Sequence, residues 1–140
     1  MRQILLILWV MFICICVFTK DVNALFFKGQ ISIDITLYPS ADMFFTIYPL
    51  MHASLFELIG HALLFSTLTY LLYINCHSLS LTFIISFFSG IITEFLQPFF
   101  GRGADIYDLL ANFTGLSSVV CFYFIERTLK RISISTSENK

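Results

Sequence analysis

Four long apolar stretches divide the chain and predict its helices. A helix needs about 20 mainly apolar residues to cross the hydrocarbon core of a membrane, and the last three stretches reach that length. The first stretch has fifteen apolar residues, which Gln3 and Thr19 can extend. The pattern therefore predicts four membrane-spanning helices. They cover residues 4–18, 55–74, 79–98 and 106–125.

The first stretch also has the features of a signal peptide. A single Arg2 precedes it, and Val22-Asn23-Ala24 offers a cleavage site with small residues at its ends. The charged Lys20 and Asp21 stand directly before that site and disfavour cleavage. We therefore predict that residues 1–19 are retained as the first transmembrane helix, in the manner of an uncleaved signal anchor.

Residues 20–53 form a long connection between the first and second stretches. Part of it alternates between apolar and polar residues, the period of a half-buried strand, until Pro39-Ser40 ends the pattern. A strand cannot face lipid without a partner, so we expect this loop to fold over the outer mouth of the bundle as a short hairpin. The aromatic segment 43–50 suits the membrane interface. The alternating apolar residues are Ile31, Ile33, Ile35 and Leu37.

Composition supports a membrane protein. The chain has 140 residues, of which 58% are hydrophobic and 12% charged, and its mean hydropathy is +0.87. These values exclude an ordinary soluble domain. A net charge of −1 without a basic patch gives no support for nucleic acid as a partner. The four cysteines fit neither a disulfide framework nor a zinc motif.

Basic residues flank both ends of the predicted bundle. Arg2 precedes the first helix, and Arg127, Lys130 and Arg131 follow the last. The positive-inside rule then places both termini in the cytoplasm, which agrees with four spans and puts the turn around Arg102 outside. The chain is thus expected to be an all-α, multi-pass protein of one domain, with a tail that loses order after its first turn. Its parts are a first helix (1–19), an extracytoplasmic loop (20–53), a three-helix core (54–125) and a cytoplasmic tail (126–140).

Polar residues gather where the third and fourth apolar stretches meet. Glu94 and Gln97 lie three residues apart near the end of the third stretch, and a Gly101-Arg102-Gly103 turn follows. At ~100° per residue, the polar positions that follow the turn fall within about 80° of one another on a helix. Both arms of this helical hairpin therefore aim polar groups at one place. The positions after the turn are Asp105, Asp108, Asn112 and Gly115.

The second stretch contributes His61 to the same layer. Ser54, Glu57 and His61 lie within about 60° on a helical wheel. At ~1.5 Å rise per residue, His61 lies about 9 Å below the outer end of its helix, at the depth of Asn112. Glu94 is a few ångströms shallower. Three helices thus place polar groups at one level of the outer leaflet.

Two explanations of this polar layer stay open. An ionisable group at the bilayer centre costs about 2.5–3.5 kcal/mol, so the groups need a reason to be there. They can pair with Arg102 and with one another to hold the helices together. Alternatively, they form a site that binds or processes a molecule in the outer leaflet.

For such a site, His61, Glu94 and Asp108 are the candidate catalytic residues, because histidine–carboxylate pairs suit general acid–base chemistry. Glu57, one turn before His61, can pair with the imidazole and orient it. Arg102 offers a planar guanidinium that fits phosphate or carboxylate, and an ion pair with Asp105 or Asp108 is equally compatible with its position. The candidate substrate-binding residues are Gln97, Arg102, Asp105 and Asn112.

The sequence gives less support for a metal site, a nucleophilic active site or a glycosylation site. Imidazole and carboxylates are plausible metal ligands, but His61, Glu94 and Asp108 have no metal-motif spacing, so we expect neither a metal nor another cofactor. No serine or cysteine has the context of a nucleophile elbow. The glycosylation sequon at Asn112 falls inside a predicted span and is discounted.

The ordered motif E-x-x-Q-x4-R-x2-D-x2-D-x3-N-x2-G at residues 94–115, with His61 in the sequence ELIGHALLF, resembles the pattern of the VanZ-like family of small bacterial membrane proteins. The resemblance covers residues 55–123. One departure is that Leu58-Ile59-Gly60 stands where that family often has an Asp-Lys pair. The resemblance implies a helical bundle in the bacterial cytoplasmic membrane with a cell-envelope role. The family's best-known member is linked to resistance against teicoplanin-type glycopeptides.

Together, the pattern and the resemblance predict a protein that binds or modifies a membrane lipid or a lipid-linked cell-wall component. The alternative is a non-catalytic scaffold or assembly factor of an envelope complex. The sequence does not decide whether the protein is an enzyme, and it identifies no protein partner.

Overall fold

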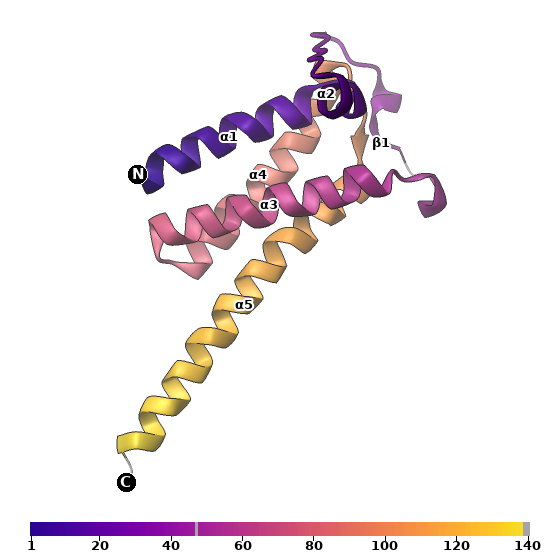
Figure 1. Cartoon of the computed structure of the whole chain (residues 1–140). Helices are drawn as coiled ribbons and strands as arrows, with labels where there is room; N and C mark the ends of the chain where they lie inside the picture. The colour runs from indigo at the N-terminus through magenta and orange to yellow at the C-terminus, as the bar shows by residue number, and fades with distance from the viewer. Residues whose placement is uncertain (47, 139–140) are drawn as a thin grey trace.

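The computed structural model describes residues 1–46 and 48–138, and it is an all-α bundle (Figure 1). The long helices α3 and α5 cross, and α4 returns beside α3. α1 packs against α3 on the side away from α5. The helices of the described part are α1 (Arg2–Phe18), α2 (Val22–Lys28), α3 (Leu55–Cys76), α4 (Leu79–Leu96) and α5 (Ile106–Glu138).

Short elements connect these helices at one end of the bundle. The two strands pair in parallel, with Phe44 opposite Ala104, so the loop after α2 is joined to the turn between α4 and α5. The short elements are η1 (Ala41–Met43), β1 (Phe44–Thr46), η2 (Leu50–His52), η3 (Gln97–Phe100) and β2 (Ala104–Asp105).

Within the described residues, three helical segments are long and apolar enough to cross a membrane. They are Leu55–Cys76, Leu79–Phe100 and Ile106–Ile134. A fourth span exists only if α1 and α2, which are bent by 116° at the break between them, count as one. α1 alone has 17 residues and is therefore about 26 Å long, slightly less than the hydrocarbon core. The predicted polytopic all-α class is confirmed, and the first span differs from the others in being short and followed by a sharp bend.

Side-chain caps define where the helices begin. The Ser54 hydroxyl accepts a hydrogen bond from the backbone N–H of Glu57 at the start of α3, and Ser78 accepts one from Leu81 at the start of α4. Asp21 does the same for α2. Such caps satisfy N–H groups that the first helical turn leaves unpaired. They place the α3–α4 turn close to where the sequence predicts it.

α3 is the central helix and packs against α1, α4 and α5. The core between α1 and α3 is apolar, and the Trp9 indole N–H donates to the Leu64 carbonyl oxygen at 3.0 Å. On the opposite side, α3 and α5 touch through their backbones at Gly115. A Cβ built there would lie 2.9 Å from the carbonyl carbon of Ala62 and closer still to its oxygen. Gly115 is therefore required for this helix crossing. The buried core residues are Ile13, Val17, Phe65, Leu68 and Leu72.

The strand predicted in the long loop is absent, because residues 29–40 have no regular structure. The alternating apolar side chains are all exposed, with Leu37 at 77%, so no core face exists for them to cover. Backbone hydrogen bonds hold the loop instead: Lys20 N–H donates to Ser32 at 2.7 Å, and Thr36 N–H donates to Phe99 at 2.9 Å. The loop does cover one end of the bundle, as expected, although through a parallel strand pair rather than a hairpin.

The aromatic segment 43–50 is described except for residue 47. Its Phe44 packs against Phe95 and Phe99, with ring centroids 5.4 and 6.1 Å apart. Aromatic contacts thus join the loop to the end of α4.

The predicted loss of order in the tail is wrong for the residues described. α5 continues through Glu138 and has 33 residues, which makes it about 50 Å long. Lys130 pairs with Glu126 one turn earlier, an arrangement that supports an exposed helix. Lys140, expected in the cytoplasm, lies outside the described residues.

The basic residues used to assign orientation lie at one end of the bundle. An Arg2 guanidinium nitrogen donates to the Ile74 carbonyl at 3.4 Å, and Arg127 donates to the His77 carbonyl at 3.0 Å. Ile74 lies in the last turn of α3, and His77 directly follows this helix. Arg102 lies at the opposite end, where α4 and α5 are joined.

Candidate functional site

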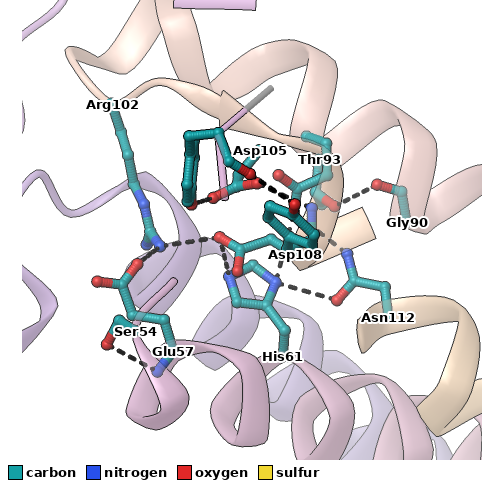
Figure 2. A network of polar contacts seen from close by, with 12 residues as sticks. Ser54, Glu57, His61, Gly90, Thr93, Arg102, Asp105, Asp108 and Asn112 are labelled. Atoms are coloured by element: carbon teal, nitrogen blue, oxygen red, sulfur yellow. Dashed lines mark hydrogen bonds and ion pairs between the residues drawn. The ribbon is translucent and has the colours of Figure 1, made fainter. Parts of the chain in front are cut away.

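His61, in the second turn of α3, is the centre of a polar network that joins three helices (Figure 2). Its Nδ1 lies 3.0 Å from Asn112 Oδ1 and 3.4 Å from Glu94 Oε1. Its Nε2 lies 3.3 Å from Asp108 Oδ2. All four side chains are buried, and His61 is only 4% exposed. The structure therefore brings together four of the seven site residues chosen from the sequence.

The hydrogen bonds of Asn112 define the protonation of His61. The Asn112 amide nitrogen donates to Glu94 Oε1 at 3.2 Å, which leaves its oxygen as the acceptor facing His61 Nδ1. Nδ1 must then carry a proton. Nε2 lies 3.3 Å from Asp108 Oδ2, close enough for an ion pair when the imidazole is protonated.

Arg102 forms the second part of the network. One guanidinium nitrogen contacts the Glu57 carboxylate and lies 3.3 Å from Asp108 Oδ2. The Glu57–His61 pair expected from their spacing is not formed, because Arg102 draws Glu57 toward the turn between α4 and α5. Of the two ion pairs considered for Arg102, the one to Asp108 is present, and Asp105 has other partners.

Asp105 joins the loop to α5 rather than to His61. Its carboxylate accepts a hydrogen bond from the Tyr107 backbone N–H at 2.8 Å and another from the Tyr48 hydroxyl. The Tyr107 hydroxyl donates to the Tyr48 carbonyl at 2.6 Å. Burial and the bond to Asp105 raise the pKa of Tyr48 above its usual range, so the phenol stays protonated and remains a donor.

These two tyrosines were not chosen from the sequence. Tyr48 lies in an aromatic loop segment and Tyr107 in an apolar stretch, and neither position carries a recognisable pattern. Their contacts form only because the loop that carries Tyr48 packs against the start of α5.

Gln97 and Glu94 contain buried polar atoms without hydrogen-bond partners. Both side chains are fully buried. Neither amide atom of Gln97 has a partner, and Glu94 Oε2 has none either. A buried polar group left unpaired costs about 1–3 kcal/mol. Gln97 therefore does not take part in the contacts around His61, although it lies one turn after Glu94.

A cavity of about 520 Å³ lies between α1, α2 and α3. Its walls are mainly apolar, and its ionisable groups are Glu57, His61 and Arg102. Of the seven site residues chosen from the sequence, only His61 and Arg102 line this cavity, because α1 and α2 supply its opposite wall. The apolar lining includes Trp9, Phe12, Phe26, Ile59 and Leu63.

A larger groove of about 640 Å³ lies between α4 and α5, near the α3–α4 turn. Its lining is apolar apart from Ser80 and Cys121, and it includes no acid, arginine, lysine or histidine. The chemistry of the protein is therefore expected at the smaller cavity.

The apolar spans with a buried polar network define a polytopic all-α membrane protein. The chain is 29% identical over 135 residues to "Uncharacterized membrane protein YwnJ" of Bacillus subtilis (strain 168), and the match covers 94% of this chain and 96% of that protein. No family model and no solved structure matches the chain. The similarity to a membrane protein thus extends over almost the whole length.

Proposed function

We propose that the protein binds a membrane lipid or a lipid-linked molecule in the cavity between α1, α2 and α3. The observation that supports this proposal is the composition of that cavity. Its apolar walls meet a group of three ionisable side chains, Glu57, His61 and Arg102. Ligand sites are typically apolar cavities with a few polar groups that fix orientation.

The polar side of the cavity suits an anionic headgroup. A guanidinium has five donors in a fixed fork, and one nitrogen of Arg102 serves both Glu57 and Asp108. Phosphate or carboxylate oxygens can bond the remaining donors in bidentate fashion. The apolar side, which includes Phe12 and Ile59, suits an acyl or isoprenoid chain.

Proton transfer is a chemistry that this site can add to binding. His61 lines the cavity, whereas Glu94 and Asp108, the other candidate catalytic residues, do not. His61 would therefore be the group that exchanges a proton with the ligand. Asp108 and Glu94 would act through the imidazole as positioning residues.

The basic end of the bundle supports an orientation in the membrane. Arg2 contacts the last turn of α3 and Arg127 contacts His77 directly after it, so the positive-inside rule favours a cytoplasmic location for this end. The cavity's polar side then lies in the outer leaflet of a bacterial cytoplasmic membrane. Reporter fusions at Gly103 and Lys140 measure this: we expect external activity at Gly103 only. External activity at Lys140 contradicts the orientation.

The fate of the first helix is tested separately. We expect the purified chain to begin near Met1, because α1 packs against α3 through Trp9 and closes one wall of the cavity. Intact-mass measurement decides this. A chain that begins at Leu25 would lack that wall.

The resemblance of the polar motif to the VanZ-like family supports a cell-envelope role for the protein. We therefore include lipid-linked cell-wall components among the proposed ligands, and we propose a link to teicoplanin-type resistance. This link is tested by measuring teicoplanin susceptibility in two strains. One strain expresses the protein, and the other expresses a variant in which a larger side chain fills the cavity. Equal susceptibility of the two strains argues against it.

A scaffold role is the second candidate, because His61, Glu94 and Asn112 are buried and bonded across three helices. Such bonds hold membrane helices together without a ligand. In that case the network would stabilise the bundle, and filling the cavity would leave the protein's activity in cells unchanged.

Gly60→Phe separates the two candidates. Gly60 lines the cavity, and a Cβ there meets no atom within 4 Å. We expect native mass spectrometry to detect a lipid that co-purifies with the wild type, and we expect the Gly60→Phe variant to fold but to lose this lipid. Gly60→Ala is the matched control and should retain lipid. The same lipid on Gly60→Phe and wild type would contradict the proposal.

A further inference from the structure

His61, Glu94 and Asp108 lie close enough together that they could hold a metal ion. Each offers one ligand atom, and the three atoms lie within 4.8 Å of one another. Zinc binds nitrogen and oxygen ligands at about 2.1 Å, which separates neighbouring ligand atoms by about 3.4 Å in a tetrahedron. His61 Nε2 and Asp108 Oδ2 are 3.3 Å apart. Their separation therefore fits two ligands of one ion.

The hydrogen bonds around His61 leave atoms of His61 and Glu94 available to bind a cation. The Asn112 side-chain oxygen accepts a hydrogen bond from His61 Nδ1–H, and metal-bound histidines usually donate such a bond from the nitrogen that does not bind the metal. Nε2 is then the nitrogen that faces Asp108. Asn112 also donates to Glu94 Oε1, while Glu94 Oε2 is buried without a partner. A bound cation would satisfy this unpaired oxygen.

The charges of the network point to a divalent ion. Glu57, Glu94 and Asp108 supply three carboxyl groups to the network, and Arg102 supplies its one guanidinium group. With His61 neutral and all three carboxyl groups ionised, as a bound cation would favour, the network carries two negative charges that Arg102 does not balance. Buried charges need compensation, and one divalent cation supplies it.

We propose that His61, Glu94 and Asp108 bind one divalent transition-metal ion such as Zn²⁺ or Mn²⁺. One imidazole and two carboxylates suit these ions. The ligands come from α3, α4 and α5, which explains why no metal-motif spacing appears in the sequence. Three protein ligands leave a coordination position for water or substrate. With the ion bound, both imidazole nitrogens of His61 are engaged, so His61 would then act as a ligand beside the cavity and not as the group that exchanges a proton.

The metal site does not depend on lipid binding. Glu94 and Asp108 do not line the cavity, so a variant that fills the cavity should still bind metal. Gly60→Phe is expected to lose lipid and keep the metal, and this separates a failure of the inference from a failure of the proposed function.

The test uses the full-length protein in detergent, stripped of metal with EDTA and then titrated with Zn²⁺ or Mn²⁺. After desalting, elemental analysis should find one equivalent of metal on the wild type. His61→Ala, Glu94→Gln and Asp108→Asn should each retain less than about a tenth of that amount, since each removes one of three ligands. Without metal, the Gln and Asn variants should melt within a few degrees of the wild type, because they keep the shape of the side chain.

Matched controls identify binding at other histidines. His52→Ala and His77→Asn alter the two remaining histidines and should retain one equivalent. Asn112→Ala should weaken metal binding about 10–100-fold. The inference is overturned if the wild type retains no more metal than His61→Ala, or if His52→Ala or His77→Asn removes the metal.

Discussion

The two sides of α3 differ sharply although their residues are neighbours in the sequence. Gly60 faces the cavity, His61 enters the polar network, and Ala62 contacts the backbone of α5 at Gly115. On the α5 side the helices touch and polar groups are fixed by partners from three helices. On the α1 side, space remains for a ligand. The protein thus combines a rigid wall, which holds His61 in place, with a loosely filled one.

The largest expected loss of stability comes from disrupting the close contact between α3 and α5. Gly115→Ala forces a Cβ into the Ala62 carbonyl group and must separate α3 from α5. Overpacking of this kind typically costs 1–3 kcal/mol, and because backbone atoms are involved we expect about 3 kcal/mol or more. Thermal unfolding in detergent measures the loss.

Gly90→Ala is the control for this substitution. A Cβ at Gly90 would meet Phe65 at 3.4 Å and Asn112 at 3.5 Å, close to ordinary contact distance, so the cost should be far smaller. Equal destabilisation by the two substitutions would show that the crossing at Gly115 is not special.

A smaller loss of stability is expected from removing hydrogen bonds of the polar network around His61. Asn112→Ala removes the bonds to His61 Nδ1 and Glu94 Oε1 and leaves these two buried groups with only their mutual contact at 3.4 Å. The expected cost in the free energy of unfolding is about 1–3 kcal/mol. Thr114→Ala, which removes only an exposed hydroxyl bonded to the Leu110 carbonyl, is the matched control on the same helix. Equal unfolding free energies for Asn112→Ala and the control would mean that the network does not hold the helices.

The smallest effect has the opposite sign and lies on the loose side. Gly60→Ala introduces a Cβ where nothing lies within 4 Å and reduces the backbone entropy lost on folding. It should stabilise the protein by about 0.5–1 kcal/mol, seen as a higher melting temperature. Destabilisation by this change would show that the cavity wall is already tightly packed.

Much of the helical framework can be predicted from the sequence. The apolar stretches locate α3, α4 and the first part of α5, and Ser54 and Ser78 cap helices where serine is expected. The polar stripe after Arg102 also predicts that Asp108 and Asn112 face His61. That prediction works because polar groups in a membrane have few partners except one another.

Other features depend on contacts between distant segments. The alternation from Ile31 to Leu37 has the period of a strand, yet no neighbouring strand pairs with it and its apolar side chains stay exposed. Glu57 is one turn from His61 but pairs with Arg102, which the turn after α4 brings to it. Local spacing carries no information on such competition between partners.

The sequence by itself therefore determined which segments are helices and which of their faces are polar, because helical periodicity and the exclusion of water act locally. The tertiary structure decided which polar groups pair and where space remains. The cavity exists because α1 and α2, bent by 116°, dock on α3 and leave the region around Gly60 unfilled. The grouping of His61, Glu94 and Asp108 requires three helices at once, and no pattern within any single helix specifies it.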